Sequence, residues 1–179
     1  MDGYSLFLKK ARRGKLDPAI LRAFKLEVER QCSFATIAAR DLENALRDRE
    51  MDRVWYSIQS ILVAAGNISK LLWPQKSKIP DRGSELRANL SVSDDSPLQP
   101  RIFRNHFEHF DDRLEEWATS STRRNFVDSN VGPIDMIRDI DPGDYLRNFN
   151  PATWTVTFRG DSYELKPIIQ EVGKILKNS

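Results

Sequence analysis

"DPAILRAFKLEVERQCSFATIAARDLENAL", residues 17–46, is the stretch that decides the fold. Asp17 can accept hydrogen bonds from the amides of a first helical turn, and proline, here Pro18, is tolerated at the first helical position. Apolar side chains then recur every three or four residues: Leu21, Phe24, Val28, Cys32, Ala35, Ala39, Leu42 and Leu46. This spacing predicts one long helix with a single apolar side.

A second apolar pattern predicts a helix over residues 54–72 that Pro74 ends. Its stripe consists of Val54, Ile58, Ile61, Leu62, Ala65, Ile68 and Leu72. Further apolar residues widen this surface, which predicts a central place in a helical bundle: Trp55, Val63, Ala64 and Leu71. The charged residues 47–53 between the two patterns are compatible with a turn and with a continuous helix.

Residues 74–100 are rich in Pro, Ser, Asp and Lys. They predict a long connection with at most one short helix, at "SELRANL", residues 84–90. Connections of this length are unusual in a compact domain, and they tend to be either disordered or functional.

The next segment, "RIFRNHFEHFDDRLEEWA", residues 101–118, contains both histidines of the chain. It predicts a third helix that begins near Pro100 and ends around Ala118 or just beyond. At about 100° per residue, one arc of this helix forms an apolar stripe: Phe103, Phe107, Phe110, Leu114 and Trp117. Arg104, Asn105 and His109 point away from the stripe, whereas His106 lies at its border and is assigned to structure.

Residues 123–152 lack a sustained period and predict an extended loop with a short helical turn. Alternating β-branched and aromatic residues in "TWTVTF", residues 153–158, predict a hairpin that turns at "RGDS". A closing helix follows from Pro167. The predicted fold is mainly α: an up-and-down helical bundle over about 17–122 and 167–178, a loop and small C-terminal β-hairpin over about 123–166, and a single domain over 1–179.

Composition narrows the class of protein. Hydrophobic residues make up 40% and charged residues 30% of the 179, which is ordinary for a soluble globular protein. No stretch is apolar enough to cross a bilayer or to form the core of a signal peptide, so we expect a cytoplasmic protein without a membrane partner. Cys32, the single cysteine, predicts a buried, inert thiol. The basic run at residues 9–15 suits phosphate contacts or a solvated surface.

Arg104, Asn105 and His109 together suit chemistry on a phosphodiester. A guanidinium binds phosphoryl oxygens in a fork, an imidazole transfers protons near neutral pH, and an amide orients a hydroxyl or a phosphate. No metal is required when the attacking group is the RNA 2′-hydroxyl. The His106-x-x-His109 spacing allows chelation, but the chain has no third histidine and no second cysteine, so we predict neither metal nor cofactor.

One helix cannot enclose a substrate from two sides, whereas two copies related by a twofold axis can. A homodimer with both sets of residues facing one cleft is therefore expected.

Arg104-Asn105-x-x-x-His109, in an amphipathic helix of a small bundle, resembles the R-x(4–6)-H motif of HEPN domains, in which a polar residue, commonly asparagine, follows the arginine. Many members of that superfamily are metal-independent ribonucleases of bacterial toxin–antitoxin, abortive-infection and CRISPR systems, and the motifs of two protomers meet at their dimer interface. The resemblance implies that Arg104, Asn105 and His109 form the catalytic set.

The resemblance covers roughly residues 17–122 and the final helix, and it has one informative departure. HEPN toxins regulated by a nucleotidyltransferase antitoxin carry a tyrosine two residues after the histidine, where this chain has Asp111. Regulation by tyrosine modification at that position is therefore excluded. Carboxylates are also abundant around the motif, and carboxylates repel phosphates.

Two functions follow as expectations. The first is a dimeric, metal-independent endoribonuclease with an RNA substrate, which serves as a toxin or phage-defence component and has an antitoxin or another protein as partner. The second is a non-catalytic helical module that uses the same residues to bind a protein partner or a nucleotide ligand.

Overall fold

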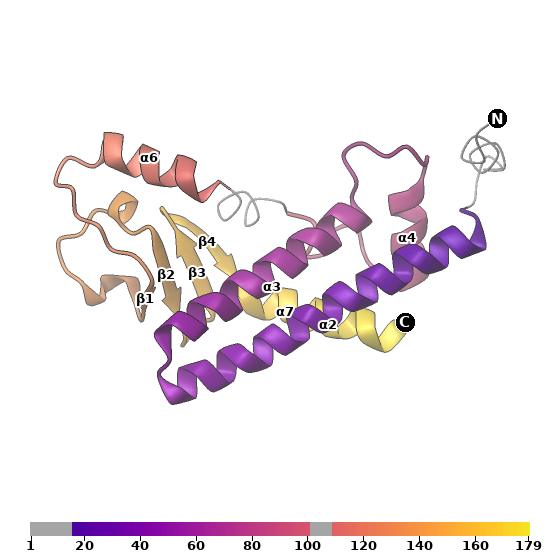
Figure 1. The fold of residues 1–179 in the computed structure, drawn as a ribbon, viewed down its shortest axis with the longest axis horizontal. Helices are drawn as coiled ribbons and strands as arrows, with labels where there is room; N and C mark the ends of the chain where they lie inside the picture. The colour runs from indigo at the N-terminus through magenta and orange to yellow at the C-terminus, as the bar shows by residue number, and fades with distance from the viewer. Residues whose placement is uncertain (1–15, 101–108) are drawn as a thin grey trace.

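The structure, a computed structural model, describes residues 16–100 and 109–179. Two long helices lie side by side in it, α2 (Pro18–Asp48) and α3 (Met51–Leu72) (Figure 1). Asp17 Oδ1 accepts hydrogen bonds from the amides of Ala19 (2.9 Å) and Ile20 (3.4 Å), as the sequence predicts. Arg49 adopts a left-handed conformation and ends α2, so the charged segment between the helices forms a tight turn.

The core of the bundle lies between these two helices. The fully or nearly fully buried side chains of α2 belong to Val28, Cys32, Ala35, Ala38, Ala39, Leu42 and Ala45. More of α3 is buried, including Ile58, Ile61, Ala64, Ala65 and Ile68. The predicted central position of α3 is thereby confirmed. None of the described helices has both the length and the apolar character needed to cross a membrane.

The short helix α4 (Arg82–Leu90) confirms the helix predicted in the long connection and begins two residues earlier. Its arginines cap the carboxyl end of α3: Arg82 Nη1 donates to the Leu71 carbonyl (2.8 Å) and Arg87 Nη1 to that of Leu72 (2.6 Å). Gly83 allows this close approach, because a Cβ there would lie 2.6 Å from the Leu72 carbonyl oxygen. The connection is therefore fastened to the bundle by side-chain to backbone contacts.

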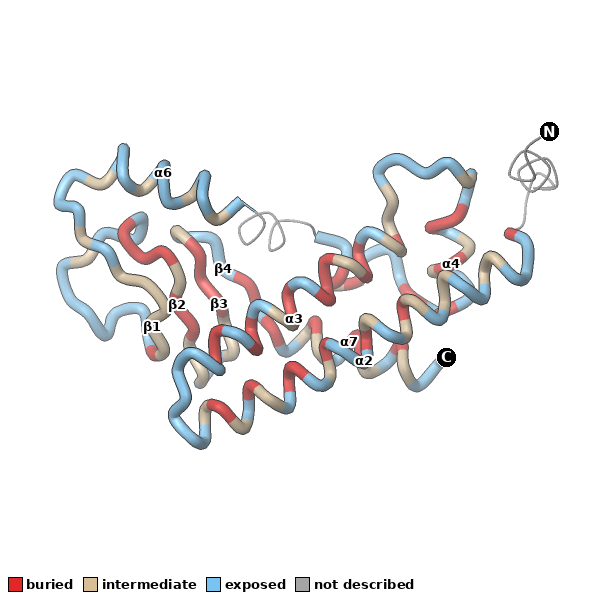
Figure 2. The backbone as a smooth tube through the Cα atoms, in the orientation of Figure 1, coloured by how far each residue is buried: buried red, intermediate tan, exposed pale blue. Residues whose placement is uncertain are grey.

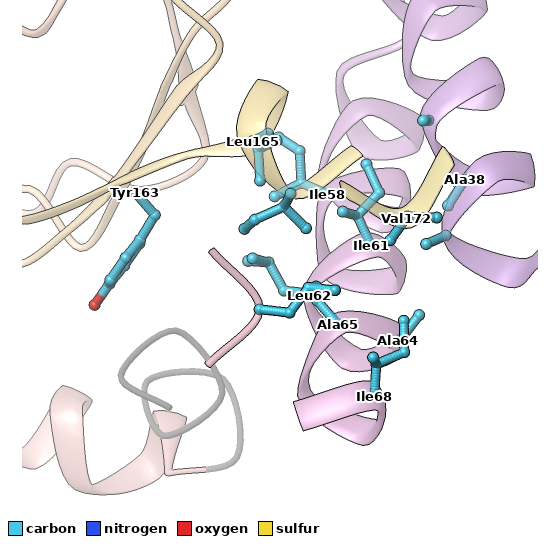
Figure 3. Packing of buried hydrophobic residues seen from close by; sticks show 14 of the residues in the cluster. Ala38, Ile58, Ile61, Leu62, Ala64, Ala65, Ile68, Tyr163, Leu165 and Val172 are labelled. Atoms are coloured by element: carbon cyan, nitrogen blue, oxygen red, sulfur yellow. The ribbon is translucent and has the colours of Figure 1, made fainter. Parts of the chain in front are cut away.

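The closing helix α7 (Leu165–Asn178) packs against α2, as its apolar spacing predicts. Figure 3 shows Leu165 and Val172 of α7 beside Ile58 and Ile61 of α3. The chain enters α7 directly from the last strand of a small sheet, and the same cluster of buried side chains continues into that sheet (Figure 2). Helices and sheet thus share one core.

The sheet is larger than the predicted hairpin. It contains β1 (Asn130–Val131), β2 (Arg147–Asn150), β3 (Thr155–Phe158) and β4 (Asp161–Glu164), in the order β1-β2-β3-β4. The hairpin β3–β4 is confirmed, with Arg159 and Gly160 at its turn (φ 45° and 92°). The prediction of an irregular loop before it is wrong, because β1 pairs in parallel with β2 and β2 pairs antiparallel with β3. Two 3-10 helices, Ile134–Met136 and Pro142–Asp144, also lie in this segment.

The third predicted helix also differs from the structure. Helix α6 spans Phe110–Ser120, and His109 immediately before it has a non-helical backbone (φ −117°, ψ 45°), so the prediction of one continuous helix from near Pro100 to about Ala118 is wrong. In addition, α6 lies along the sheet and not in the bundle (Figure 1). The Phe110 ring meets Phe158 of β3 edge-on, with ring centroids 6.1 Å apart. The apolar partner that α6 needs is supplied by the sheet.

Arg147 of β2 joins the sheet, the bundle and α6. Its Nε donates to Asp128 Oδ1 (2.7 Å), and its Nη2 donates to the second carboxylate oxygen of Asp128. The guanidinium also lies over two aromatic rings, 4.8 Å from the centroid of Phe110 and 5.6 Å from that of Trp55. Such contacts are strongest where solvent is largely excluded, and only 21% of the Arg147 side chain is exposed.

Replacing Arg147 by Met should lower the free energy of unfolding by about 2 kcal/mol, because the largely buried Asp128 carboxylate then loses its charged partner. Urea denaturation followed by circular dichroism measures the loss. Arg40→Met, on the exposed side of α2, is the control and should change stability by less than about 0.5 kcal/mol. Equal free energies of unfolding for the two variants would contradict the role of Arg147 in joining the sheet, the bundle and α6.

Cys32 should be chemically inert in the native protein. Its thiol is fully buried in α2, and burial, assisted by the nearby Glu29, raises its pKa to about 12, so the reactive thiolate is scarce at pH 8. Iodoacetamide should modify Cys32 only as fast as the protein unfolds. A Cys32→Ala, Ser33→Cys variant moves the thiol to the exposed neighbouring position and should react at once. Equally fast reaction of both proteins would contradict the buried placement.

Candidate functional site

The structure describes one of the three predicted site residues. His109 lies immediately before α6, whereas Arg104 and Asn105 lie outside the described residues, as does His106. The described part of the site is therefore His109 together with the side chains of α6 that surround it.

His109 is exposed and has a carboxylate beside it. The side chain is 58% exposed, and its Nδ1 lies 3.3 Å from Oδ2 of Asp112, three residues further along. The backbone carbonyl of His109 accepts a hydrogen bond from the Arg113 amide (3.2 Å), which fixes the residue to the first turn of the helix. A carboxylate at Nδ1 favours the tautomer with the proton on that nitrogen, and it leaves Nε2, on the other edge of the ring, to accept a proton.

A shallow hollow of about 540 Å³ opens beside the imidazole. Its described lining comes from His109, Asp112, Arg113, Glu115, Glu116 and Thr119. Carboxylates outnumber cations there, which confirms that the surroundings of His109 are acidic, as the sequence indicates. Helix α6 also has no fully buried residue, and Leu114, expected in its apolar stripe, is 37% exposed.

Two guanidinium groups that were not predicted from the sequence to belong to the site, those of Arg113 and Arg159, contact Glu116 in the lining of this hollow. Arg113 Nη1 donates to Glu116 Oε1 (2.6 Å), and this hydrogen bond raises the Arg113 pKa. Arg159, at the β3–β4 turn, donates from Nη1 to the Arg113 carbonyl (3.2 Å) and from Nη2 to Ser120 Oγ (3.3 Å). Its Nε lies 4.0 Å from Glu116 Oε2. Glu116 therefore holds two cations close to His109.

A larger hollow, of about 710 Å³, lies between the end of α3, the start of α4 and Pro100. Its arginines, Arg82 and Arg87, already cap α3, and its other lining includes Trp73, Ile79 and three prolines. We therefore assign this hollow to the contacts that attach residues 74–100 to the end of α3. Within residues 16–100 and 109–179, no three His, Cys, Asp or Glu side chains are grouped so that they could hold a metal ion.

No protein-family model matches the chain, and comparisons with curated proteins and with solved structures give no significant match. The function is therefore inferred from the residues themselves.

Arg159→Ala should loosen α6 without disturbing the bundle. Helix α6 is fastened by few contacts, which include Phe110 against Phe158, the hydrogen bond from Trp117 Nε1 to the Asn125 carbonyl (2.8 Å), and Arg159. Hydrogen exchange measured by mass spectrometry should become at least about tenfold faster in residues 110–120 and stay unchanged in α2 and α3. Lys166→Ala, an exposed cation near the start of α7, is the control. Unchanged exchange in α6 would exclude the anchoring role.

Proposed function

We propose that this protein is a metal-independent endoribonuclease of the HEPN type, in which Arg104, Asn105 and His109 form the catalytic set. The observation that carries the proposal is the exposed imidazole of His109, with Asp112 at its Nδ1 and a hollow beside it. An imidazole in this setting can exchange a proton with a bound ligand, which is the minimum that acid–base catalysis requires.

The reaction needs only groups of the protein and the RNA. The 2′-hydroxyl gives its proton to His109 and attacks the adjacent phosphorus, the bond from phosphorus to O5′ breaks, and O5′ receives a proton from water. The products are a 2′,3′-cyclic phosphate and a 5′-hydroxyl. Arg104 stabilises the charge that develops on the phosphoryl oxygens, and Asn105 positions the substrate.

The guanidinium groups of Arg113 and Arg159 support this proposal. Arg113 lines the hollow together with His109, Arg159 donates to the Arg113 carbonyl, and both guanidinium groups interact with the half-exposed Glu116. A phosphate that enters the hollow can replace Glu116 as the partner of Arg113, which offsets the repulsion from the neighbouring carboxylates.

The remaining expectations belong to the same proposal. The active species is a homodimer with its catalytic sets at the subunit interface, the protein is cytoplasmic, and it serves as a toxin or phage-defence component with an antitoxin or another protein as partner.

A second candidate function is a non-catalytic HEPN-like module that binds a protein partner or a nucleotide ligand through the same residues. The acidic lining of the hollow favours this alternative, because Asp112, Glu115 and Glu116 would attract a basic protein surface and repel RNA.

The two histidines provide the test. With the purified protein in EDTA, we expect cleavage of a labelled RNA to fall by at least about 100-fold in His109→Ala, because the proton acceptor is lost. His106→Ala is the matched control and should keep most of the activity. Circular dichroism and the oligomeric state should be unchanged in both.

Equal cleavage by wild type and His109→Ala would remove the proposed catalytic role. If wild type cleaves no RNA but forms a stable complex with a protein, and His109→Ala or Asp112→Asn weakens that complex, the non-catalytic function replaces the enzyme.

A further inference from the structure

One face of the α2–α3 pair carries large apolar side chains that the rest of the described chain leaves exposed. The other side of the pair packs against α4 and α7. On the open side, the exposed apolar residues are Leu26, Phe34 and Ile37 of α2 and Tyr56 and Val63 of α3. Ile37 is 57% exposed and Tyr56 is 69% exposed. We refer to these five residues as the outer patch.

Two polar bridges place the outer patch on one surface. Gln31 Oε1 accepts from Asn67 Nδ2 (3.3 Å), and Asp41 lies 3.7 Å from Arg53, so these contacts mark the line along which the two helices meet. Phe34 is three residues after Gln31 and seven before Asp41, and it therefore lies on the same line.

On either side of this line, each helix carries apolar side chains that project further outward. On a helical wheel, Ile37 projects about 60° further outward than Phe34, and Val63 projects about 40° further outward than Asn67. In the antiparallel register that these two bridges set, Val63 lies level with Phe34, and Ile37 lies about one helical turn away. The outer patch is thus a surface formed by two helices, in which Phe34 lies in the groove between them and the apolar side chains of Ile37 and Val63 project on either side.

We propose that the outer patch binds the outer patch of a second copy of this chain, with the two α2 helices antiparallel about a twofold axis near residues 35 and 36. This interface is separate from the one proposed at the catalytic sets, because none of its five residues lines the hollow at His109; it is a second association step that does not depend on the proposed function.

The charges of α2 favour this arrangement. In an antiparallel pair centred at residue 35.5, Phe34 faces Ile37 and Arg30 faces Asp41. In the same register Arg22 faces Arg49 and lies one residue from Asp48. The pair of opposite charges that the register aligns is Arg30 with Asp41, and it occurs twice by symmetry. A parallel, in-register pair would place every charge opposite its own copy, which is unfavourable.

The size of the surface is also adequate. Helix α2 has 31 residues, or about 46 Å at 1.5 Å per residue. With α3 alongside, the face is about 20 Å wide, so its area is on the order of 800 Å², which is what each partner of a stable complex buries. Two such faces form an antiparallel four-helix arrangement with an apolar centre.

The oligomeric state of the full chain tests this interface. In sedimentation velocity over a range of concentrations, the wild-type assembly should have twice the mass of the Ile37→Glu assembly, whose dissociation constant for this step should rise by at least about 100-fold, because the change places a carboxylate in the centre of the contact. Ile137→Glu is the matched control: it makes the same change at another exposed isoleucine, outside α2 and α3, and should leave the dimer intact.

Charge reversal tests the register. Arg30→Asp and Asp41→Arg should each raise the dissociation constant by about tenfold, and the double variant should return it to within about threefold of wild type, since both changes restore opposite charges across the axis.

The proposal is overturned if wild type is monomeric at 50 to 100 μM (about 1 to 2 mg/mL), if Ile37→Glu forms the same assembly as wild type with the same affinity, or if the double variant is no tighter than the single ones. Ile37→Ser gives an uncharged version of the first change. None of these readouts uses RNA, so a failure of the ribonuclease proposal leaves this test intact.

Discussion

The close packing of α2 against α3 is the constraint on which the rest of the structure depends. Alanines make up much of the buried side of both helices, among them Ala38 and Ala45 on α2 and Ala64 and Ala65 on α3. Small side chains let two helix backbones approach closely, and larger residues such as Leu42 and Ile61 then fill the space on the covered side. The same pairing creates the open side, where Phe34 and Ile37 remain in contact with solvent. One packing arrangement thus generates both the core and the surface proposed for self-association.

The sheet extends this core and positions the candidate site. Strand β4 continues directly into α7, and the Leu165 amide donates to the Trp154 carbonyl (2.9 Å), so the sheet cannot move far from the bundle. Arg147 then links β2 to Trp55 of α3 and to Phe110 of α6. Because His109 directly precedes Phe110, the orientation of the imidazole depends on this chain of contacts from the bundle outward.

Elements with a strong local period were predictable from the sequence, and elements that depend on distant partners were not. The stripes of α2, α3 and α7 and the alternation in β3 all appear within single segments. Strand β1, by contrast, is two residues long and exists through its pairing with β2, as at Asn130 with Asn148. The contact of Arg159 with α6 spans 46 residues and left no local signal. The exposure of His109 was predictable, but its position before the helix was not.

The central claim is that RNA is cleaved through its own 2′-hydroxyl with His109 as proton acceptor. A labelled oligonucleotide carrying one 2′-deoxy substitution at the mapped cleavage position tests it most directly. The account predicts that cleavage at that position is lost, that it persists at unsubstituted positions, and that the products end in a 2′,3′-cyclic phosphate and a 5′-hydroxyl. Undiminished cleavage at the deoxy position, or products with a 3′-hydroxyl, would contradict it.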